Sequence, residues 1–260
     1  MTVTLQTLCW ERDWKRTLTT GRLQTLSEYN LFPFDRKTLL INKLGSYSRV
    51  SSLARAAIEK GWISDFIIVE EYADAALRFF DLTRDDLGKG YVYSIAELVG
   101  IYICNSDFLL FYMADCMPVE RCDWIPAAMN MLAIDERIKV ANLLWNGNYE
   151  GAKQESLMET EAFFIGQGFS DQCYLIRPGD FRKPIYGYQH PASERYPEYG
   201  GDTFEKRVDS WMRCHGYLRA TYKHASYLHR NLPPPVTQQI RQKIKGFLRG
   251  GLANLRGRSF

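Results

Sequence analysis

The chain has 260 residues, of which 46% are hydrophobic and 24% charged, and its formal net charge is +3. These values are typical of a soluble globular protein that is long enough for one α/β domain with a full core. The sequence contains no run of about 18 apolar residues, and its polar beginning does not resemble a signal peptide. We therefore expect neither a membrane-spanning nor an exported protein.

The six cysteines are scattered along the chain without a CxxC pair. Regular cysteine spacing is typical of disulfide-stabilised secreted proteins, whereas free cysteines in apolar surroundings behave as small hydrophobic side chains. We interpret all six as reduced thiols and predict a cytoplasmic protein.

Strands and helices are expected to alternate through the first half of the chain. Short apolar runs predict strands, and apolar residues at helical spacing predict helices. In chain order, we expect a strand at 2–10, a helix at 13–29, a strand at 37–45, a helix at 48–61, a strand at 64–72, a helix at 93–105, and strands at 107–116, 138–145 and 173–177. This alternation indicates an α/β fold with a doubly wound, mainly parallel sheet flanked by helices.

Two later segments are interpreted as separate from these regular elements. Residues 178–201 are rich in Pro, Gly and Tyr and are expected to form a long loop, of the kind that usually covers a binding site. Residues 230–260 contain seven basic and no acidic residues, and the sequence NLPPPV interrupts the chain near their start. We therefore predict one domain at 1–229 and a basic C-terminal tail at 230–260.

Apolar residues recur in this tail at helical spacing among the basic ones. They are Ile240, Ile244, Phe247, Leu248, Leu252 and Leu255. A basic amphipathic helix can lie in an anionic membrane surface, so peripheral attachment to the inner face of the membrane is one expectation. The alternative is that the tail packs against the rest of the chain, whose net charge is −4.

The most informative stretch is DFLLFYMADCMP, residues 107–118. It predicts a buried strand that ends in one carboxylate, Asp115, before a turn at Pro118. In open α/β sheets, ligands bind beyond the carboxyl ends of the strands. A ligand-binding role and simple capping of the turn both fit Asp115. The GxGxxG, Walker A, HExxH and GxSxG motifs are absent from the sequence, which disfavours the sites that these motifs form.

Residues 100–118, GIYICNSDFLLFYMADCMP, resemble the helix, strand and acidic turn of GT-A glycosyltransferases, particularly those of family 2. In that family the strand delivers a DxD motif. Aligned on Asp115, the last acid of the motif is present and Met113 replaces the first. The resemblance implies that Asp115 binds a Mn²⁺ or Mg²⁺ ion that bridges the nucleotide diphosphate, while Met113 leaves the dependence on metal open.

A second block, GGDTFEKRVDSWMRCHG at 200–216, resembles the part of the family that carries the general base. The spacing from Gly216 assigns this role to Glu205, with Asp202 as the reserve. A helix N-terminus favours an ionised carboxylate, as a base requires. The same residues also form a possible capping box with Asp202 at the N-cap and Glu205 at N3, which needs no catalytic role.

The resemblance also assigns the metal and nucleotide contacts. In YLRATYKHASYLH at 217–229, His229 corresponds to the histidine that completes the metal shell, and His224 is the fallback. Residues at the carboxyl-terminal ends of the first two predicted strands correspond to the nucleotide contacts: Cys9, Trp10, Glu11 and Asn42.

On the acceptor side, the segment GFSDQCYLIR resembles the family's acceptor-binding segment. The resemblance assigns Asp171 to an acceptor hydroxyl, although capping of a turn would explain this residue equally well. In the loop at 178–201, Tyr188 is expected to stack on a sugar ring, and Tyr186 and Tyr199 are alternatives.

The leading hypothesis is therefore an enzyme, a glycosyltransferase that moves a sugar from a nucleotide-diphosphate sugar to a saccharide or lipid-linked acceptor in surface polysaccharide or glycolipid synthesis. A sugar-phosphate nucleotidylyltransferase shares much of this fold, but it would need a Gly-rich loop where the chain has CWERDWKR. The third hypothesis is a non-catalytic nucleotide-sugar or glycan-binding protein. It is considered because Met113 replaces the first acid of the DxD motif. We expect no nucleic-acid partner.

Overall fold

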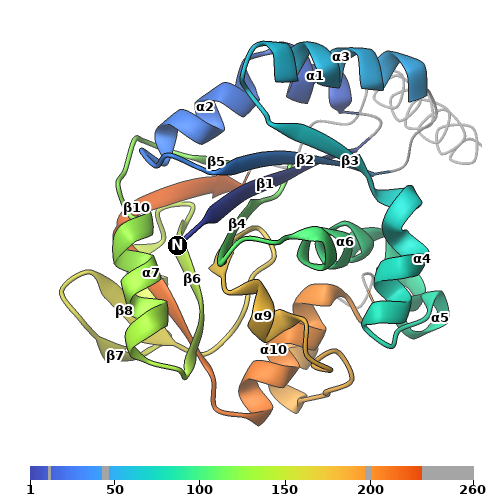
Figure 1. Ribbon diagram of the computed structural model, residues 1–260. Helices are drawn as coiled ribbons and strands as arrows, with labels where there is room; N and C mark the ends of the chain where they lie inside the picture. Colours follow the sequence, from blue (N-terminus) through green and yellow to red (C-terminus); the bar gives the residue numbers. More distant parts are fainter. Residues whose placement is uncertain (11–12, 43–46, 197–200, 230–260) are drawn as a thin grey trace, which may run out of the picture. The chain divides into compact units, whose positions relative to one another are not determined.

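The computed structural model describes residues 1–10, 13–42, 47–196 and 201–229. In this part of the chain, ten strands form one sheet, in which β3, β2, β1, β4, β9, β6, β10, β8 and β7 are successive neighbours and β5 pairs with β10 (Figure 1). The strands are β1 (Val3–Trp10), β2 (Arg36–Asn42), β3 (Asp65–Ile68), β4 (Phe108–Tyr112), β5 (Cys116–Pro118), β6 (Ile138–Trp145), β7 (Ser156–Glu159), β8 (Phe163–Gly166), β9 (Cys173–Ile176) and β10 (Leu218–His229).

The central strands of this sheet are mainly parallel. β1 pairs in parallel with β2 and β4, β2 with β3, and β6 with β10. β9 lies between β4 and β6 in the opposite direction, and β5 and β8 run antiparallel to β10. The mainly parallel sheet predicted from the sequence is thereby confirmed. The carboxyl ends of β1, β2, β4, β6 and β10 therefore meet at one edge of the sheet, where ligands bind in folds of this kind.

Helices lie on both sides of the sheet, with α1, α2 and α3 on one side of β1–β3 and α4 and α6 on the other (Figure 1). The helices are α1 (Trp14–Thr19), α2 (Arg22–Tyr29), α3 (Tyr47–Glu59), α4 (Val69–Phe79), α5 (Arg84–Leu87), α6 (Ile95–Ile103), α7 (Ile125–Ile134), α8 (Tyr149–Gln154), α9 (Pro178–Phe181) and α10 (Phe204–Cys214), with 3-10 turns η1 (Gly88–Tyr93) and η2 (Pro191–Arg195).

Side chains along β4 alternate between two apolar clusters on the opposite faces of the sheet. Phe108, Leu110 and Tyr112 pack in the cluster that includes α2 and α7. Leu109 and Phe111 pack in the cluster that includes α4, α6, α9 and α10. Successive side chains of a strand point to opposite faces, so a strand covered on both faces needs an uninterrupted apolar run. The sequence FLLFY provides this run.

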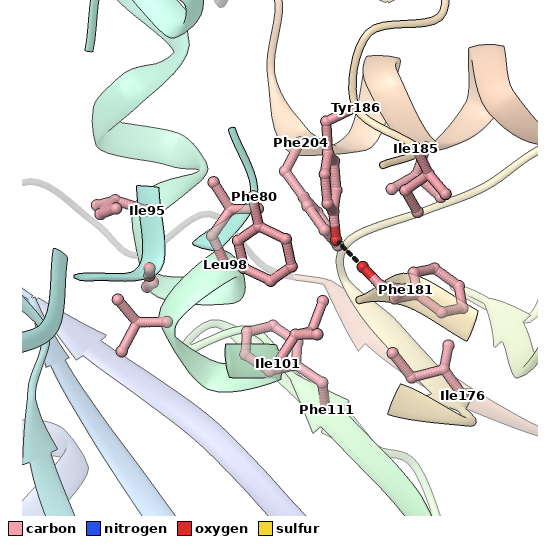
Figure 2. Packing of buried hydrophobic residues seen from close by; sticks show 14 of the residues in the cluster. Phe80, Ile95, Leu98, Ile101, Phe111, Ile176, Phe181, Ile185, Tyr186 and Phe204 are labelled. Carbon is pink, nitrogen blue, oxygen red and sulfur yellow. Dashed lines mark hydrogen bonds between the residues drawn. The ribbon is translucent and has the colours of Figure 1, made fainter. Parts of the chain in front are cut away.

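Packing on the α10 face determines where α10 begins. Phe204, the first residue of α10, lies beside Tyr186, with ring centroids 5.9 Å apart, and the Tyr186 ring also packs against Phe80 at 5.1 Å (Figure 2). The Tyr186 hydroxyl donates a hydrogen bond to the Phe181 carbonyl at 2.8 Å. The backbone N–H of Phe204 donates to the hydroxyl of Ser94 at 2.8 Å. The first turn of α10 is thus fixed by ring packing and by a hydrogen bond to Ser94, the N-cap residue of α6.

Several element boundaries predicted from the sequence are wrong. The strand predicted at 64–72 ends at Ile68, because the following residues form the amphipathic helix α4. The helix predicted at 13–29 is divided at Gly21, whose φ of 73° is the left-handed conformation that glycine adopts readily. The loop predicted at 178–201 contains α9 and η2.

No helix in the described ranges is long and apolar enough to cross a bilayer. The basic tail predicted at 230–260, together with its membrane attachment, lies outside the described residues. Its separation from a domain at 1–229 stays a prediction, as does the cytoplasmic location.

Phe204→Ala should lower the free energy of unfolding by about 3–5 kcal/mol, because it removes a fully buried ring. Phe204→Leu keeps much of the volume and should cost about 1 kcal/mol. Ile134→Ala is the matched control, because this side chain at the end of α7 is 67% exposed. Urea unfolding measures all three variants, and equal midpoints for the two alanine variants would contradict the packing described for α10.

Candidate active site

Asp115 and His229 are brought together by the pairing of two short strand segments. After β4 the chain turns through Asp115 into β5, and β5 pairs antiparallel with the end of β10 so that Cys116 lies opposite His229. Nε2 of His229 is 3.1 Å from Oδ2 of Asp115, although the two residues are 114 positions apart in the sequence. The hydrogen bond that His229 makes to Asp115 raises the pKa of His229, since the carboxylate accepts from and stabilises the charged imidazolium.

This pair fits a hard divalent cation. One potential ligand atom from each of Asp115, Cys116 and His229 lies within 4.8 Å of the other two. Burial, followed by the charge of Asp115, raises the pKa of the Cys116 thiol, and hard cations prefer oxygen and nitrogen ligands to a protonated thiol. The suitable donors are therefore the carboxylate and the imidazole, which are 22% and 24% exposed.

A further acid, Asp13, lies near Asp115 at the carboxyl end of β1. Its carboxylate accepts a hydrogen bond of 2.8 Å from the backbone N–H of Trp10, which closes the turn into α1. Burial raises the pKa of Asp13 to about 6; the charge of Asp115 also raises it, and Arg22 opposes the rise. Nη2 of Arg22 donates to the Cys116 carbonyl at 2.8 Å, so that this guanidinium links α2 to the turn that carries Asp115.

Asp171 and Glu205 form a second acidic pair on the α10 face. The backbone N–H of Asp171 donates to Oε1 of Glu205 at 3.3 Å. Burial raises the pKa of Asp171 to about 6, while the charge of His229 lowers it and that of Asp115 raises it. Burial, and then the charge of Asp171, raises the pKa of Glu205 well above its usual value. Asp171 therefore interacts electrostatically with both Glu205 and the Asp115–His229 pair.

Neither a protein-family profile nor a curated protein sequence matches the chain. Solved structures do match it. The mannosyltransferase PcManGT from Pyrobaculum calidifontis, solved with GDP-Man and Mn²⁺, is similar with a TM-score of 0.56 at 14% identity, over 90% of this chain and 58% of its own. GalNAc-T7, solved with UDP, GalNAc and Mn²⁺, has a TM-score of 0.56 at 11% identity, over 88% of this chain and 44% of its own. This chain thus spans 58% and 44% of the lengths of these two proteins.

The chain has the GT-A fold. The resemblance to GT-A glycosyltransferases inferred from the sequence is thereby confirmed at the level of the fold. Met113, which replaces the first acid of the DxD motif, packs against both apolar clusters. Its backbone N–H donates to the Gln172 carbonyl at 2.9 Å. Met113 thus joins the turn at the end of β4 to the segment that leads into β9.

The nucleotide contacts predicted by resemblance lie at the ends of β1 and β2 in the GT-A sheet. The thiol of Cys9 is fully buried among the side chains that pack under α1 and α3, so only the backbone of this residue is available to a ligand. Trp10 is half-buried and is the last residue of β1. Asn42 ends β2, and its amide donates to the Val92 carbonyl at 3.4 Å. Glu11 lies outside the described residues.

The capping box predicted with Asp202 at the N-cap is wrong. α10 begins at Phe204, and Thr203 is the N-cap residue, whose hydroxyl accepts a hydrogen bond of 3.3 Å from the Lys206 N–H. Glu205 is consequently at N2, and its carboxylate contacts Asp171 instead of capping the helix. Asp202 is 42% exposed and forms an ion pair of 3.1 Å with the Lys206 amine. The capping explanation for Glu205 is therefore removed.

Two of the three tyrosines considered as acceptor contacts, Tyr186 and Tyr188, lie within the described residues. Tyr188 packs edge-to-face on His215, next to the C-terminal end of α10, with centroids 4.8 Å apart. Tyr186 is a core residue. The metal-capable cluster in the described part of the chain contains His229 and not His224. Tyr199 lies outside the described residues.

Two features of the site were missed by sequence reasoning. The first is Asp13, an acid directly after a strand, which is the same signal that drew attention to Asp115. The second is a cavity of about 580 Å³ next to Asp171, which no sequence pattern indicates. Its lining residues come from β6, from α8 and the residues that flank it, from the segment before β9, from the end of η2 and from β10: Asn142, Leu143, Trp145, Asn148, Gly151, Ala152, Glu155, Ser170, Gln172, Arg195, Tyr196, Arg219, Thr221 and Tyr227.

Asp171→Asn and Glu205→Gln should each stabilise the protein at pH 7 while changing little at pH 4. An acid whose pKa is raised in the folded state binds its proton more tightly there than in the unfolded chain. Its contribution to stability is therefore present below the unfolded pKa of roughly 4 and is lost as the pH rises through the folded pKa, about 6 for Asp171. Each variant lacks the acid that it replaces, so that acid no longer lowers stability as the pH rises.

Thermal unfolding of each variant and of the wild type at both pH values measures this effect. Asp123→Asn, which changes an exposed acid before α7, is the control for the loss of one carboxylate charge. If the melting temperatures of variant and wild type differed by the same amount at pH 4 and at pH 7, these two carboxyls would not have raised pKa values.

Proposed function

We propose that the protein is a glycosyltransferase that takes a sugar from a nucleotide-diphosphate sugar and transfers it to an acceptor hydroxyl. The observation that carries this proposal is the convergence of Asp115, His229, Asp171 and Glu205 at the carboxyl edge of a GT-A sheet. Two proteins of similar fold provide further support, because they were solved with GDP-Man or UDP and with Mn²⁺. Substrates, partners and metal use are all part of the proposal.

On the donor side, we assign Asp115 and His229 to a Mn²⁺ or Mg²⁺ ion. When bound, this ion would neutralise the diphosphate oxygens and so stabilise the leaving group. Asp13 and Asn42, which follow β1 and β2 at the same edge, are assigned to hydrogen bonds with the nucleoside. The backbone of Cys9 and the residues Trp10 and Glu11 belong to the same proposed nucleotide-binding segment.

On the acceptor side, we assign Glu205 as the general base, and Asp202 becomes the less suitable candidate. The Glu205 carboxylate takes the proton of the acceptor hydroxyl while the acceptor oxygen bonds to the anomeric carbon. The bond from that carbon to the diphosphate breaks, and the nucleoside diphosphate leaves with the electron pair. Burial and the charge of Asp171 raise the pKa of Glu205, which makes its carboxylate a stronger base once it is ionised.

Asp171 is assigned a supporting role in the same step. Its backbone N–H holds Oε1 of Glu205, and its own carboxylate is placed in the proposal as the acceptor of a hydrogen bond from the substrate hydroxyl. A single displacement of this kind inverts the configuration at the anomeric carbon. The acceptor is proposed to be a saccharide or a lipid-linked molecule in surface polysaccharide or glycolipid synthesis. Tyr188 is proposed as an outer acceptor contact, and residues 230–260 are proposed to attach the protein to the membrane.

Glu205→Gln should reduce turnover by about 10²–10⁴-fold and leave donor binding unchanged. Glutamine keeps the shape of the side chain and can accept the bond from Asp171, but it cannot take the substrate proton. The assays are transfer or hydrolysis of UDP- and GDP-sugars, and calorimetric binding of the donor. Asp202→Asn is the matched control on the adjoining segment and should retain activity, since Asp202 is paired with Lys206 at the surface. Full activity of Glu205→Gln would reject Glu205 as the base.

Asp115→Asn and His229→Gln should abolish the Mn²⁺-dependent part of donor binding. In the wild type, Mn²⁺ together with UDP or GDP should raise the melting temperature more than either component alone, because only the folded state binds them. His224→Gln is the matched control, since His224 lies on β10 outside the metal-capable cluster. A wild type with no Mn²⁺-dependent rise would contradict the donor site. Donor binding without any turnover would favour the non-catalytic alternative.

A further inference from the structure

Several residues that line the cavity are neighbours or contacts of the proposed reaction centre. Ser170 and Gln172, the neighbours of Asp171 in sequence, both line it. Tyr227 lines it too, and its hydroxyl is 3.2 Å from Oε1 of Gln172. Burial, and then the charge of Glu205, raises the pKa of Tyr196, another lining residue, so the proposed base lies close to this wall.

The cavity is built on β6 and β10, which lie beyond β9 in the sheet from β1, β2 and β4. Most of the proposed donor contacts follow β1, β2 and β4, whereas His229 comes from the end of β10 itself. Arg219 and Thr221 on β10 alternate with Leu218 and Ala220, which pack in the cluster under α7. Arg219 and Thr221 therefore point to the face that carries α10 and Glu205.

Two arginine side chains converge on one point of the cavity wall. A Cβ atom added to Gly168 would lie 2.8 Å from Nη2 of Arg195 and 3.6 Å from Nη1 of Arg219, so both guanidinium groups pack against this glycine. The φ of Gly168 is 108°, in the region that favours glycine. Two like charges this close repel each other unless negative charge lies nearby. Oδ1 of Asp209 lies 3.6 Å from the same point, so one buried carboxylate faces both guanidinium groups here.

The compensating charges in the described structure are incomplete. Asp209 is fully buried and is already bound to Ser193 and to Arg213 at 2.5 and 2.8 Å, while its other oxygen is 3.6 Å from Arg195. Arg219, whose side chain is only 14% exposed, has one carboxylate partner among the described residues, Glu155 at 3.3 Å. Glu155 is itself 58% exposed, so the pair is a weak one.

The Nε of Arg219 also lacks a partner: it is buried and has no hydrogen-bond partner within the described residues. A charged group that is buried with an incomplete set of partners costs stability, and such a cost is typical of sites that bind a ligand. An anion in the cavity would supply the missing charge to Arg195 and Arg219 together.

We propose that this cavity is the acceptor subsite and that it takes an acceptor carrying an anionic group, a phosphate or a carboxylate, held between Arg195 and Arg219. The guanidinium group suits this role, because its planar fork matches the oxygens of both anions. The proposal rests on the glycosyltransferase function above, and it names the chemical class of the acceptor. Glu155 occupies the place of the anion at Arg219 and is displaced when the acceptor binds.

The remaining wall suits the sugar part of such an acceptor. Trp145, at the carboxyl end of β6, lines the cavity and is 49% exposed, which leaves a ring face available for stacking. The hydroxyl of Thr221 donates to the amide oxygen of Asn142 at 2.8 Å, so the base of the cavity also presents ordered polar groups. A sugar ring on Trp145 and an anion at the arginines would lie in one cavity of about 580 Å³.

Direct binding of small probes to the full chain tests the proposal without relying on turnover. Glucose 1-phosphate and glucuronate should bind about tenfold or more tightly than glucose, as expected of charge-assisted hydrogen bonds, and the preference should weaken with added salt. Arg195→Gln and Arg219→Gln should each remove most of this preference. Glu155→Gln should strengthen anion binding, because it removes the competing carboxylate of Arg219.

The arginine variants should weaken anion binding and Glu155→Gln should strengthen it. These opposite effects separate ligand binding from a structural role. If Arg219→Gln fails to fold, as circular dichroism would show, Arg195→Gln and Glu155→Gln still decide the question. Equal binding of glucose and glucose 1-phosphate by the wild type would overturn the proposal, as would anion binding that is unaffected by Arg195→Gln and Glu155→Gln. Loss of UDP or GDP binding in Arg195→Gln would also overturn it, because the cavity would then belong to the donor.

Transfer assays distinguish the source of the anion and separate this proposal from the one on which it rests. Transfer of sugar to glucose 1-phosphate indicates a soluble phosphorylated acceptor, and transfer to a polyprenyl phosphate in micelles indicates a lipid-linked one; both support the subsite. Transfer to neutral saccharides alone would overturn it while leaving the glycosyltransferase function intact. Failure of the wild type to bind any sugar nucleotide would instead contradict the glycosyltransferase function. The affinities for glucose, glucose 1-phosphate and glucuronate would still test the anion site.

Discussion

The antiparallel pairing of β5 with the end of β10 is the contact on which the candidate site depends. It sets Cys116 opposite His229 and so brings the acid at the end of β4 within hydrogen-bond distance of a histidine 114 residues later. β10 reaches this position only because it first pairs with β6 and β8 and then shifts register between Tyr222 and Ser226. Such irregularities bend a strand, and here the bend lies just before the segment that meets β5.

The site combines carboxyl groups whose burial costs stability with an apolar core that offsets this cost. Asp13, Asp171 and Glu205 all have raised pKa values, with burial as the largest cause. Each ionised carboxylate near neutral pH therefore opposes folding. The rings around Phe204 stabilise the same region, so that α10 can hold Glu205 beside Asp171. Rigid packing behind the site and electrostatic strain within it are thus found on the same helix.

The sequence allowed the fold class and part of the site to be predicted. The apolar run of β4 identifies a strand covered on both faces, and its terminal acid identifies the edge where ligands bind in GT-A proteins. Asp13 was overlooked because a single acid before a helix is also what an ordinary N-cap provides. The proximity of Arg195 and Arg219 could not be predicted, since it depends on how η2 and β10 approach Gly168 in space. The wrong N-cap on α10 arose because Asp202 and Thr203 are both good capping residues and only packing selects between them.

The position of β10 in the sheet also has a consequence for biosynthesis. β10 is the last described strand, yet it lies between β6 and β8 in the interior of the sheet. Until residues 218–229 have left the ribosome, β6 and β8 each lack a neighbour on one side and β5 lacks its partner. Unpaired apolar strand edges promote aggregation, and pairings between distant segments form slowly. A nascent or prematurely terminated chain that lacks β10 therefore exposes these strand edges and cannot assemble the Asp115–His229 pair.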